Sequence, residues 1–109
     1  MVLVGDVSGK GLKAAMLGTL LVGAANALTK ENLTPAQMLA RLNESLYGRT
    51  DGGFSTCLCC VIEPDGRLTL SNAGHLVPYR NGQEVVCASG LPLGLVVGAE
   101  YAETELQPW

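Results

Sequence analysis

Charge is scarce in this chain of 109 residues. Charged residues make up 16% of the sequence and apolar residues 48%, a balance that is too apolar for a disordered segment and suits one small domain with a buried core. The seven Lys and Arg residues are scattered, and the formal net charge is −3. Because no basic stripe is present, the composition argues against nucleic acid as a partner.

The sequence also lacks a secretory signal and a long uninterrupted apolar run. The apolar stretch 14–25 is shorter than the roughly 20 residues that span a bilayer. It begins too far into the chain, and without the usual cationic flank, for a signal peptide. We therefore expect a cytoplasmic protein with no membrane partner.

Cysteines paired at the spacing of a zinc site are absent as well. Cys57, Cys59 and Cys60 lie within four residues of one another and Cys87 is distant, whereas zinc sites usually hold two separated pairs. On a strand, Cys57 and Cys59 would share one face and Cys60 the other. We expect buried, unreactive thiols rather than metal ligands or nucleophiles.

Two helical patterns occupy the first half of the chain. The second is the clearer, because Thr34 suits an N-cap, Pro35 the first helical position and Gln37 a capping box, with Gly48 as the stop. The first follows a short apolar strand at residues 1–5 and is expected to run from about residue 9 to about residue 28. Its apolar stripe consists of Leu17, Leu20, Leu21, Ala24 and Leu28.

From Phe54 onward the pattern predicts strands. Residues 54–62 are apolar on both faces, which is typical of a central strand covered on both sides. Turns are predicted at Pro64-Asp65-Gly66 and at Asn81-Gly82, the second of which is a hairpin signal. Further strands are expected at 68–71, 77–80, 84–87 and 101–106. The order of elements indicates an α+β domain, with helices packed on a mostly antiparallel sheet and a second layer beyond it.

The junction between the first strand and the first helix is the most specific feature. It places Asp6 before a glycine-rich turn that contains Gly9-Lys10-Gly11. A phosphate-binding Walker loop is excluded, because it needs glycine where Val4 stands and a hydroxyl where Gly11 stands; the dinucleotide-binding glycine pattern fails as well. Asp6 could supply a hard oxygen to Mg²⁺ or Mn²⁺, together with a neighbouring carbonyl, or it could cap the helix. Local chemistry alone favours capping slightly.

Four segments in order extend this signal over nearly the whole chain. They are Gly5-Asp6-Val7-Ser8-Gly9-Lys10-Gly11-Leu12 with Ala14-Ala15, Phe54-Ser55-Thr56 leading to Glu63-Pro64-Asp65-Gly66-Arg67-Leu68, Asn72-Ala73-Gly74-His75, and Gly90-Leu91-Pro92-Leu93-Gly94. The series resembles the PPM-type metal-dependent protein phosphatases, and among them the SpoIIE-like bacterial branch.

This resemblance implies an αββα sandwich with two Mn²⁺ or Mg²⁺ ions between its sheets. The implied reaction is hydrolysis of phosphoserine or phosphothreonine by a metal-bridging hydroxide. Asp6 then matches the bridging aspartate, which makes it the expected catalytic residue, and the Val7 carbonyl matches a backbone ligand. The residues expected to shape the turn behind the metals are Gly5, Ser8, Gly9 and Gly11.

The segment that contains Asn72, Gly74 and His75 is less readily assigned. A lone histidine invites an acid–base role, because imidazole exchanges protons near neutral pH. We expect instead that Asn72 and His75 make structural hydrogen bonds within this motif.

Aspartates are too few for a complete two-metal site. Besides Asp6 there are only Asp51 and Asp65, both in loop-like contexts, and the seven glutamates mostly occupy positions typical of exposed residues. The resemblance places the other metal-binding aspartates of the family upstream and downstream of this segment. We therefore expect residues 1–109 to form the central part of a phosphatase domain, partial at both ends and inactive by itself.

Two functions follow as hypotheses. The first is a protein serine/threonine phosphatase that acts on a phosphorylated regulatory protein of the anti-sigma-factor antagonist type. The second is a catalytically dead phosphatase-like module that binds a partner protein in bacterial stress or sigma-factor signalling. A homodimer remains open in either case.

Overall fold

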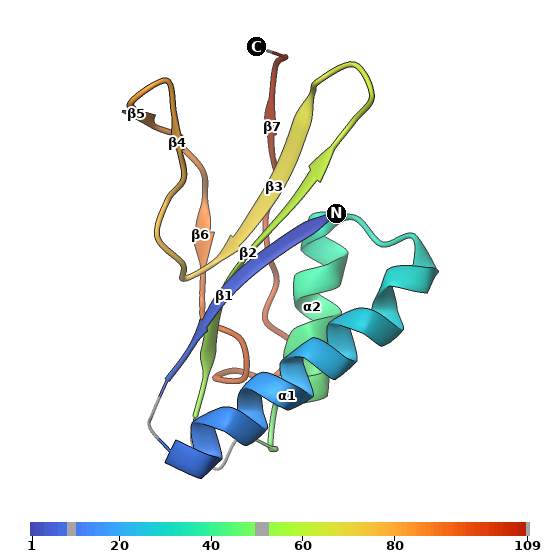
Figure 1. Cartoon of the computed structure of the whole chain (residues 1–109), viewed down its shortest axis with the longest axis vertical. Helices are drawn as coiled ribbons and strands as arrows, with labels where there is room; N and C mark the ends of the chain where they lie inside the picture. The colour runs from blue at the N-terminus through green and yellow to red at the C-terminus, as the bar shows by residue number, and fades with distance from the viewer. Residues whose placement is uncertain (9–10, 50–52, 109) are drawn as a thin grey trace.

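The computed structural model describes residues 1–8, 11–49 and 53–108. Their order is strand, two helices, then strands, and both helices lie on the same side of the main sheet (Figure 1). The helices are α1 (Gly11–Leu28), the short 3-10 turn η1 (Thr29–Glu31) and α2 (Pro35–Leu46). The strands are β1 (Val2–Val7), β2 (Ser55–Ile62), β3 (Leu68–Ala73), β4 (Tyr79–Arg80), β5 (Gln83–Glu84), β6 (Ser89–Gly90) and β7 (Thr104–Leu106).

The main sheet has the order β1-β2-β3-β6, and β7 also pairs with β3. β2 is therefore central, as expected, and lies antiparallel to both β1 and β3. The β3–β6 pair is parallel, which the expectation of a mostly antiparallel sheet did not include. A parallel neighbour requires a crossover, and residues 74–88, which contain the β4–β5 hairpin, provide it.

The start of α2 forms as its sequence predicts. The Thr34 hydroxyl accepts the backbone N–H of Gln37 at 3.3 Å, and the Gln37 side chain accepts the backbone N–H of Thr34 at 3.0 Å. This reciprocal capping box satisfies two donors that no helical carbonyl can reach. The inner face of α2 is fully buried and carries Met38, Leu39, Leu42 and Leu46.

The apolar stripe of α1 is also confirmed, since Leu17 and Leu28 are buried and its other members pack against them. Away from this stripe Leu12 and Met16 are 77% and 62% exposed, and Val22, which also lines the cavity described below, is 61% exposed. By length and composition alone, Gly11–Glu31, which is longer than the apolar stretch 14–25, could cross a membrane. Core helices and signal sequences satisfy the same criterion, which therefore does not establish a membrane span.

Three of the predicted strands are longer than the observed ones. The Asn81-Gly82 hairpin forms, with both residues at positive φ (54° and 78°), as a two-residue turn of this kind requires. Its strands are only two residues each, however. The Val85 N–H still donates to the Pro78 carbonyl at 2.9 Å, but Pro78 has no N–H with which to continue the ladder. The last strand likewise covers Thr104–Leu106 rather than 101–106.

The inner face of β2 contributes Cys57 and Cys59 to the core, at 2% and 0% exposure, whereas Cys60 on the other face is half-buried. Burial raises the pKa of the Cys57 thiol to about 11. Burial, with smaller contributions from the neighbouring thiols, raises the pKa of Cys59 to about 12. The prediction of buried thiols is confirmed for these two residues, and their raised pKa values agree with low reactivity.

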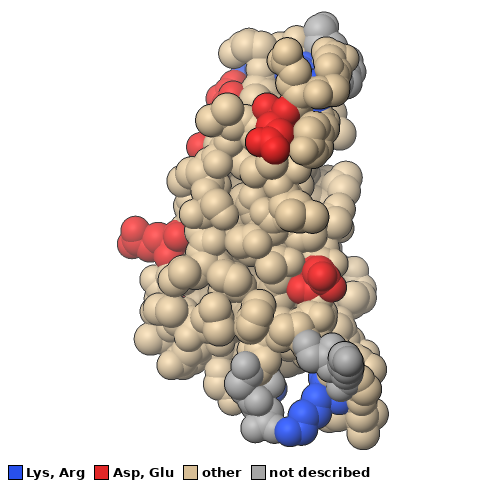
Figure 2. Space-filling model, turned by 90° about the vertical axis from the view of Figure 1, so that its left-hand side faces the viewer, with Lys and Arg blue, Asp and Glu red and all other residues tan. Residues whose placement is uncertain are grey.

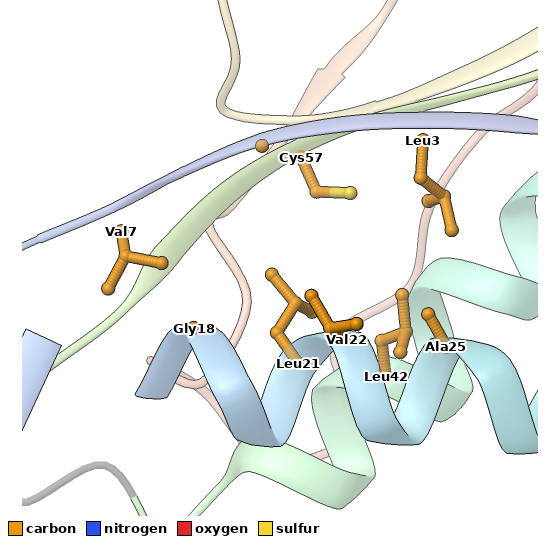
Figure 3. Close-up of a pocket in the computed structure, with 9 residues that line it drawn as sticks. Leu3, Val7, Gly18, Leu21, Val22, Ala25, Leu42 and Cys57 are labelled. Atoms are coloured by element: carbon orange, nitrogen blue, oxygen red, sulfur yellow. The ribbon is translucent and has the colours of Figure 1, made fainter. Parts of the chain in front are cut away.

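A cavity of about 230 Å³ separates α1 from the sheet. Side chains from β1, β2 and both helices point into it, and they carry carbon atoms and one sulfur but no oxygen or nitrogen (Figure 3). Its lining residues are Leu3, Gly5, Val7, Gly18, Leu21, Val22, Ala25, Leu42 and Cys57. This space suits apolar packing and offers nothing to a phosphate.

Charged side chains are few on one face of the molecule. On the face in Figure 2, acidic side chains are isolated and most of the surface is uncharged. No basic band crosses this face, in keeping with the composition.

Candidate metal and phosphate site

Asp6 lies in β1 directly opposite Thr56 of β2. Strand alternation turns Asp6 away from the face on which Leu3 and Val7 pack against the core, and its side chain is exposed. Its carboxylate accepts no hydrogen bond from a described residue. The alternative that Asp6 caps the helix depends on donors in the turn, where Gly9 and Lys10 lie outside the described residues.

The backbone of Val7 is placed to offer its carbonyl. Ser8 N–H donates to the Phe54 carbonyl at 2.9 Å, and antiparallel ladders alternate between bonded and non-bonded pairs. Val7, opposite Ser55, is therefore in a non-bonded pair, and its carbonyl points away from β2. Since β1 has no second neighbour among the described strands, this oxygen faces an open sheet edge.

The turn after β1 is tied to the start of β2. Besides the bond from its N–H, the Ser8 hydroxyl accepts the backbone N–H of Phe54 at 2.9 Å. Gly5 permits close approach of the strands, because a Cβ there would lie 2.8 Å from the Thr56 carbonyl. Gly11 begins α1 with a φ of +72°. The prediction for Gly9 falls on a residue outside the described ones.

Ser55 joins three of the four motif segments. Its buried hydroxyl lies 3.0 Å from the Thr56 carbonyl and 3.2 Å from the Asp6 carbonyl. Its backbone exchanges two hydrogen bonds with Leu93, at 3.1 and 2.7 Å. The glycine-rich turn, the start of β2 and the segment 90–94 therefore meet around one residue.

The remaining motif segment, 72–75, contacts the start of β2 and the segment 90–94. Asn72, 1% exposed, accepts the His75 N–H at 2.7 Å through its Oδ1 and donates to the His75 carbonyl at 3.0 Å through its Nδ2. The His75 ring nitrogen Nδ1 lies 2.9 Å from the Thr56 hydroxyl. Gly74 has a φ of +69°, and a Cβ there would lie 2.8 Å from the Pro92 ring. The segments 72–75 and 90–94 are thus in direct contact.

Asn43 is a structural residue of this region that the sequence pattern did not reveal. It lies on α2, is 1% exposed, accepts the Gly94 N–H at 2.8 Å and donates to the Val96 carbonyl at 2.8 Å. In the sequence, its role is indicated only by its position, since Asn43 is an amide on the otherwise apolar face of α2. The Asn43 side chain fixes the loop after β6 to α2.

The remaining acids lie elsewhere. Asp65 is exposed in its turn, as predicted, where the Arg67 backbone N–H and then the Arg67 side chain hold the pKa of its carboxyl below the usual range. All seven glutamates are exposed, and Glu103 accepts the Ala36 N–H at the start of α2. Within 1–8, 11–49 and 53–108 no three His, Cys, Asp or Glu residues cluster as a metal site; Asp51 lies outside these ranges.

The motif segments thus form one connected region, and their order along the chain has a counterpart among known families. A family model described as stage II sporulation protein E (SpoIIE) matches residues 1–108. The chain belongs to the SpoIIE family. No curated protein matches the sequence.

Membership in the SpoIIE family confirms the resemblance to PPM-type phosphatases, and the α+β arrangement of two helices and a sheet agrees with part of such a domain. Mn²⁺ or Mg²⁺ dependence is general in PPM-type phosphatases. The roles assigned to Asp6, Val7 and the turn residues stay predictions, as does the extent of the domain.

Proposed function

We propose that this SpoIIE-family chain is the central part of a metal-dependent protein serine/threonine phosphatase. Its substrate would be phosphoserine on a regulatory protein of the anti-sigma-factor antagonist type, and its location the cytoplasm. The observation that carries the proposal is the exposed Asp6 carboxylate beside an unpaired Val7 carbonyl, at the point where the four family segments meet.

The donors at this point suit a hard cation. Carboxylate and carbonyl oxygens are the ligands that Mg²⁺ and Mn²⁺ prefer, and Asp6 and Val7 would supply one of each. Bound ions would provide a hydroxide at neutral pH and neutralise charge on the phosphoryl group. The contribution of this chain is to hold the two oxygens in place, through the bond between Ser8 and Phe54 and the contact of the Ser55 hydroxyl with the Asp6 carbonyl.

The test is manganese-dependent release of phosphate from a phosphoserine protein. It is run on the 109-residue chain and on a longer version of the domain that supplies the further aspartates implied by the family. In the longer version Asp6→Asn should reduce release by more than roughly 100-fold, since losing even an outer-sphere partner of a metal ligand costs about 10- to 100-fold. Asp65→Asn, another exposed aspartate, is the matched control and should retain activity. Unchanged activity in Asp6→Asn would contradict the assignment.

We further propose that the 109-residue chain is inactive by itself. Of the two aspartates among residues 1–8, 11–49 and 53–108, Asp6 lies where the motif segments meet, whereas Asp65 is bound by Arg67 in the turn before β3. Calorimetry with Mn²⁺ should then show weak binding or none. Tight binding of two ions by this chain would overturn that proposal.

The alternative is a catalytically dead module that docks a partner protein. The exposed apolar residues Leu12, Met16 and Val22 on α1 favour it, because apolar patches often mark interaction surfaces. A longer version that binds no manganese and releases no phosphate, yet retains a protein partner, would select this alternative.

A further inference from the structure

His75 stands on the same face of the sheet as Asp6. Thr56 lies directly opposite Asp6 in the β1–β2 ladder, so both side chains project from that face. The His75 ring contacts Thr56, with Nδ1 2.9 Å from the hydroxyl oxygen. A carboxylate, a hydroxyl and an imidazole therefore follow one another across the site.

The imidazole is held from two directions. Asn72 fixes the His75 backbone with bonds to both its N–H and its carbonyl, at 2.7 and 3.0 Å, and Thr56 fixes one ring nitrogen. Asn72 is itself buried, so this support is rigid. The second ring nitrogen, Nε2, makes no hydrogen bond with a described residue, although the ring is only half-buried.

The distances indicate which ring nitrogen carries the proton. The Thr56 hydroxyl has one hydrogen to donate and two candidate acceptors: His75 Nδ1 at 2.9 Å and the Asp6 carbonyl at 3.4 Å. The contact with the Asp6 carbonyl is the weaker of the two, because 3.4 Å is long for a bond between oxygen atoms. The shorter contact favours donation from the hydroxyl to Nδ1, and the hydrogen of the neutral ring is then on Nε2. The protonated ring also carries a hydrogen there, so Nε2 is a donor in both states.

We propose that His75 is a phosphoryl-binding residue of this site, with Nε2–H donating to a phosphoryl oxygen of the substrate. The inference rests on the proposed function for the identity of the substrate. A phosphoryl group offers only acceptor oxygens and carries negative charge, so a fixed N–H donor beside Asp6 suits it. Thr56 acts through His75 as a positioning residue.

The test uses the fact that the chain has one histidine. A long-range ¹H–¹⁵N spectrum of the imidazole reports which nitrogen carries hydrogen, with no ambiguity of assignment. We expect the Nε2–H tautomer in the free protein. Addition of a phosphoserine peptide should shift the Nε2 resonance saturably. Inorganic phosphate tests whether the phosphoryl group alone suffices, and the unphosphorylated peptide should cause no shift.

Variants separate phosphoryl binding from a merely structural role. His75→Ala should weaken binding of the phosphoserine peptide about 10- to 100-fold, the usual effect of losing a hydrogen bond to a charged group. Thr56→Val should retain the fold, shown by circular dichroism, but lose the single tautomer. Thr56→Ser, which keeps the hydroxyl, should retain the single tautomer.

An Nδ1–H tautomer in the free protein would overturn the proposal. So would an Nε2 chemical shift that stays unchanged when the phosphoserine peptide is added. These readouts need no turnover. A longer version of the domain that binds phosphoserine through His75 but releases no phosphate would contradict the proposed function and leave this inference standing.

Discussion

At the scale of single residues, two buried amide side chains hold the segments of the site region together. Asn43 and Asn72 are each 1% exposed, and each uses both ends of its amide on main-chain groups: Asn43 on Gly94 and Val96, and Asn72 on His75. A buried polar group is tolerated when its partners are all supplied. The two residues therefore connect α2 and β3 to loops that carry family motifs.

Asn43→Ala should lower the free energy of unfolding by roughly 2–4 kcal/mol, because the Gly94 N–H and the Val96 carbonyl would lose their buried partner. Urea unfolding followed by circular dichroism measures this. Asn26→Ala on the exposed side of α1 is the matched control, and its unfolding free energy should change by no more than about 0.5 kcal/mol. Equal effects of the two substitutions would show that the Asn43 contacts contribute nothing.

Alkaline pH should destabilise the chain through its two core thiols. Burial keeps Cys57 and Cys59 protonated in the folded state, with pKa values of about 11 and about 12, whereas an exposed thiol ionises near 8.5. Above that pH the unfolded chain binds fewer protons than the folded one. Stability should therefore be constant below about pH 8 and fall toward pH 10, by up to about 1.4 kcal/mol per pH unit for each thiol.

Urea unfolding under reducing conditions between pH 7 and pH 10 checks this trend. Tyr101, whose pKa burial raises to about 12, contributes only at higher pH. In a variant with both Cys57→Ala and Cys59→Ala, the free energy of unfolding should fall less steeply above pH 8. The same slope in this variant would rule out the thiols as the cause.

Loose packing between α1 and the sheet is the main feature at the scale of elements. The apolar cavity lies against Gly18 of α1 (Figure 3), where a methyl group would meet only Val7, at 3.9 Å. The helix therefore contains a glycine that neither its backbone nor its neighbours require.

Gly18→Ala should raise the free energy of unfolding by about 1–1.5 kcal/mol, about 1 kcal/mol from helix propensity and the rest from apolar contact. Gly23→Ala is the matched control, because it lies on the same helix with no atom within 4 Å of the added methyl. Its free energy of unfolding should rise only by the contribution of helix propensity, about 1 kcal/mol. Thermal and urea unfolding of both variants measure the difference, and a loss of stability in Gly18→Ala would contradict the assigned cavity.

The contact between the end of β3 and the loop 91–94 calls for a different pair of variants. Gly74→Ala combines a positive φ with a clash against Pro92, whereas Gly82→Ala in the hairpin turn has a positive φ and open space. We expect Gly82→Ala to cost about 1 kcal/mol and Gly74→Ala about 1–3 kcal/mol more. Unfolding free energies measure both, and equal costs would mean that the loop moves aside freely.

For the whole molecule, prediction from sequence succeeded where the signal was local. The capping box of Thr34 and Gln37 and the Asn81-Gly82 turn depend on neighbouring residues, and both form. The parallel β3–β6 pair and the bond from Ala36 to Glu103 join distant segments, and nothing nearby in the sequence indicates them.

The same limit applies to the candidate site. Asp6 could be singled out from the order of motifs, and the family match supports that order. The contact between Thr56 and His75 could not, because it depends on how β2 and the loop after β3 are packed.

The meeting of segments at Ser55 links ligand binding to global stability. Asp6 and Ser55 are 49 positions apart, and the bonds to Leu93 close a second long loop. Closing such loops is entropically costly and comes with folding of the whole chain, so the unfolded chain holds no preformed version of this site. By mass action, a ligand bound only by the folded state at a hundred times its Kd would stabilise the entire domain by about 2.7 kcal/mol. Its midpoint of thermal unfolding would then depend on ligand concentration.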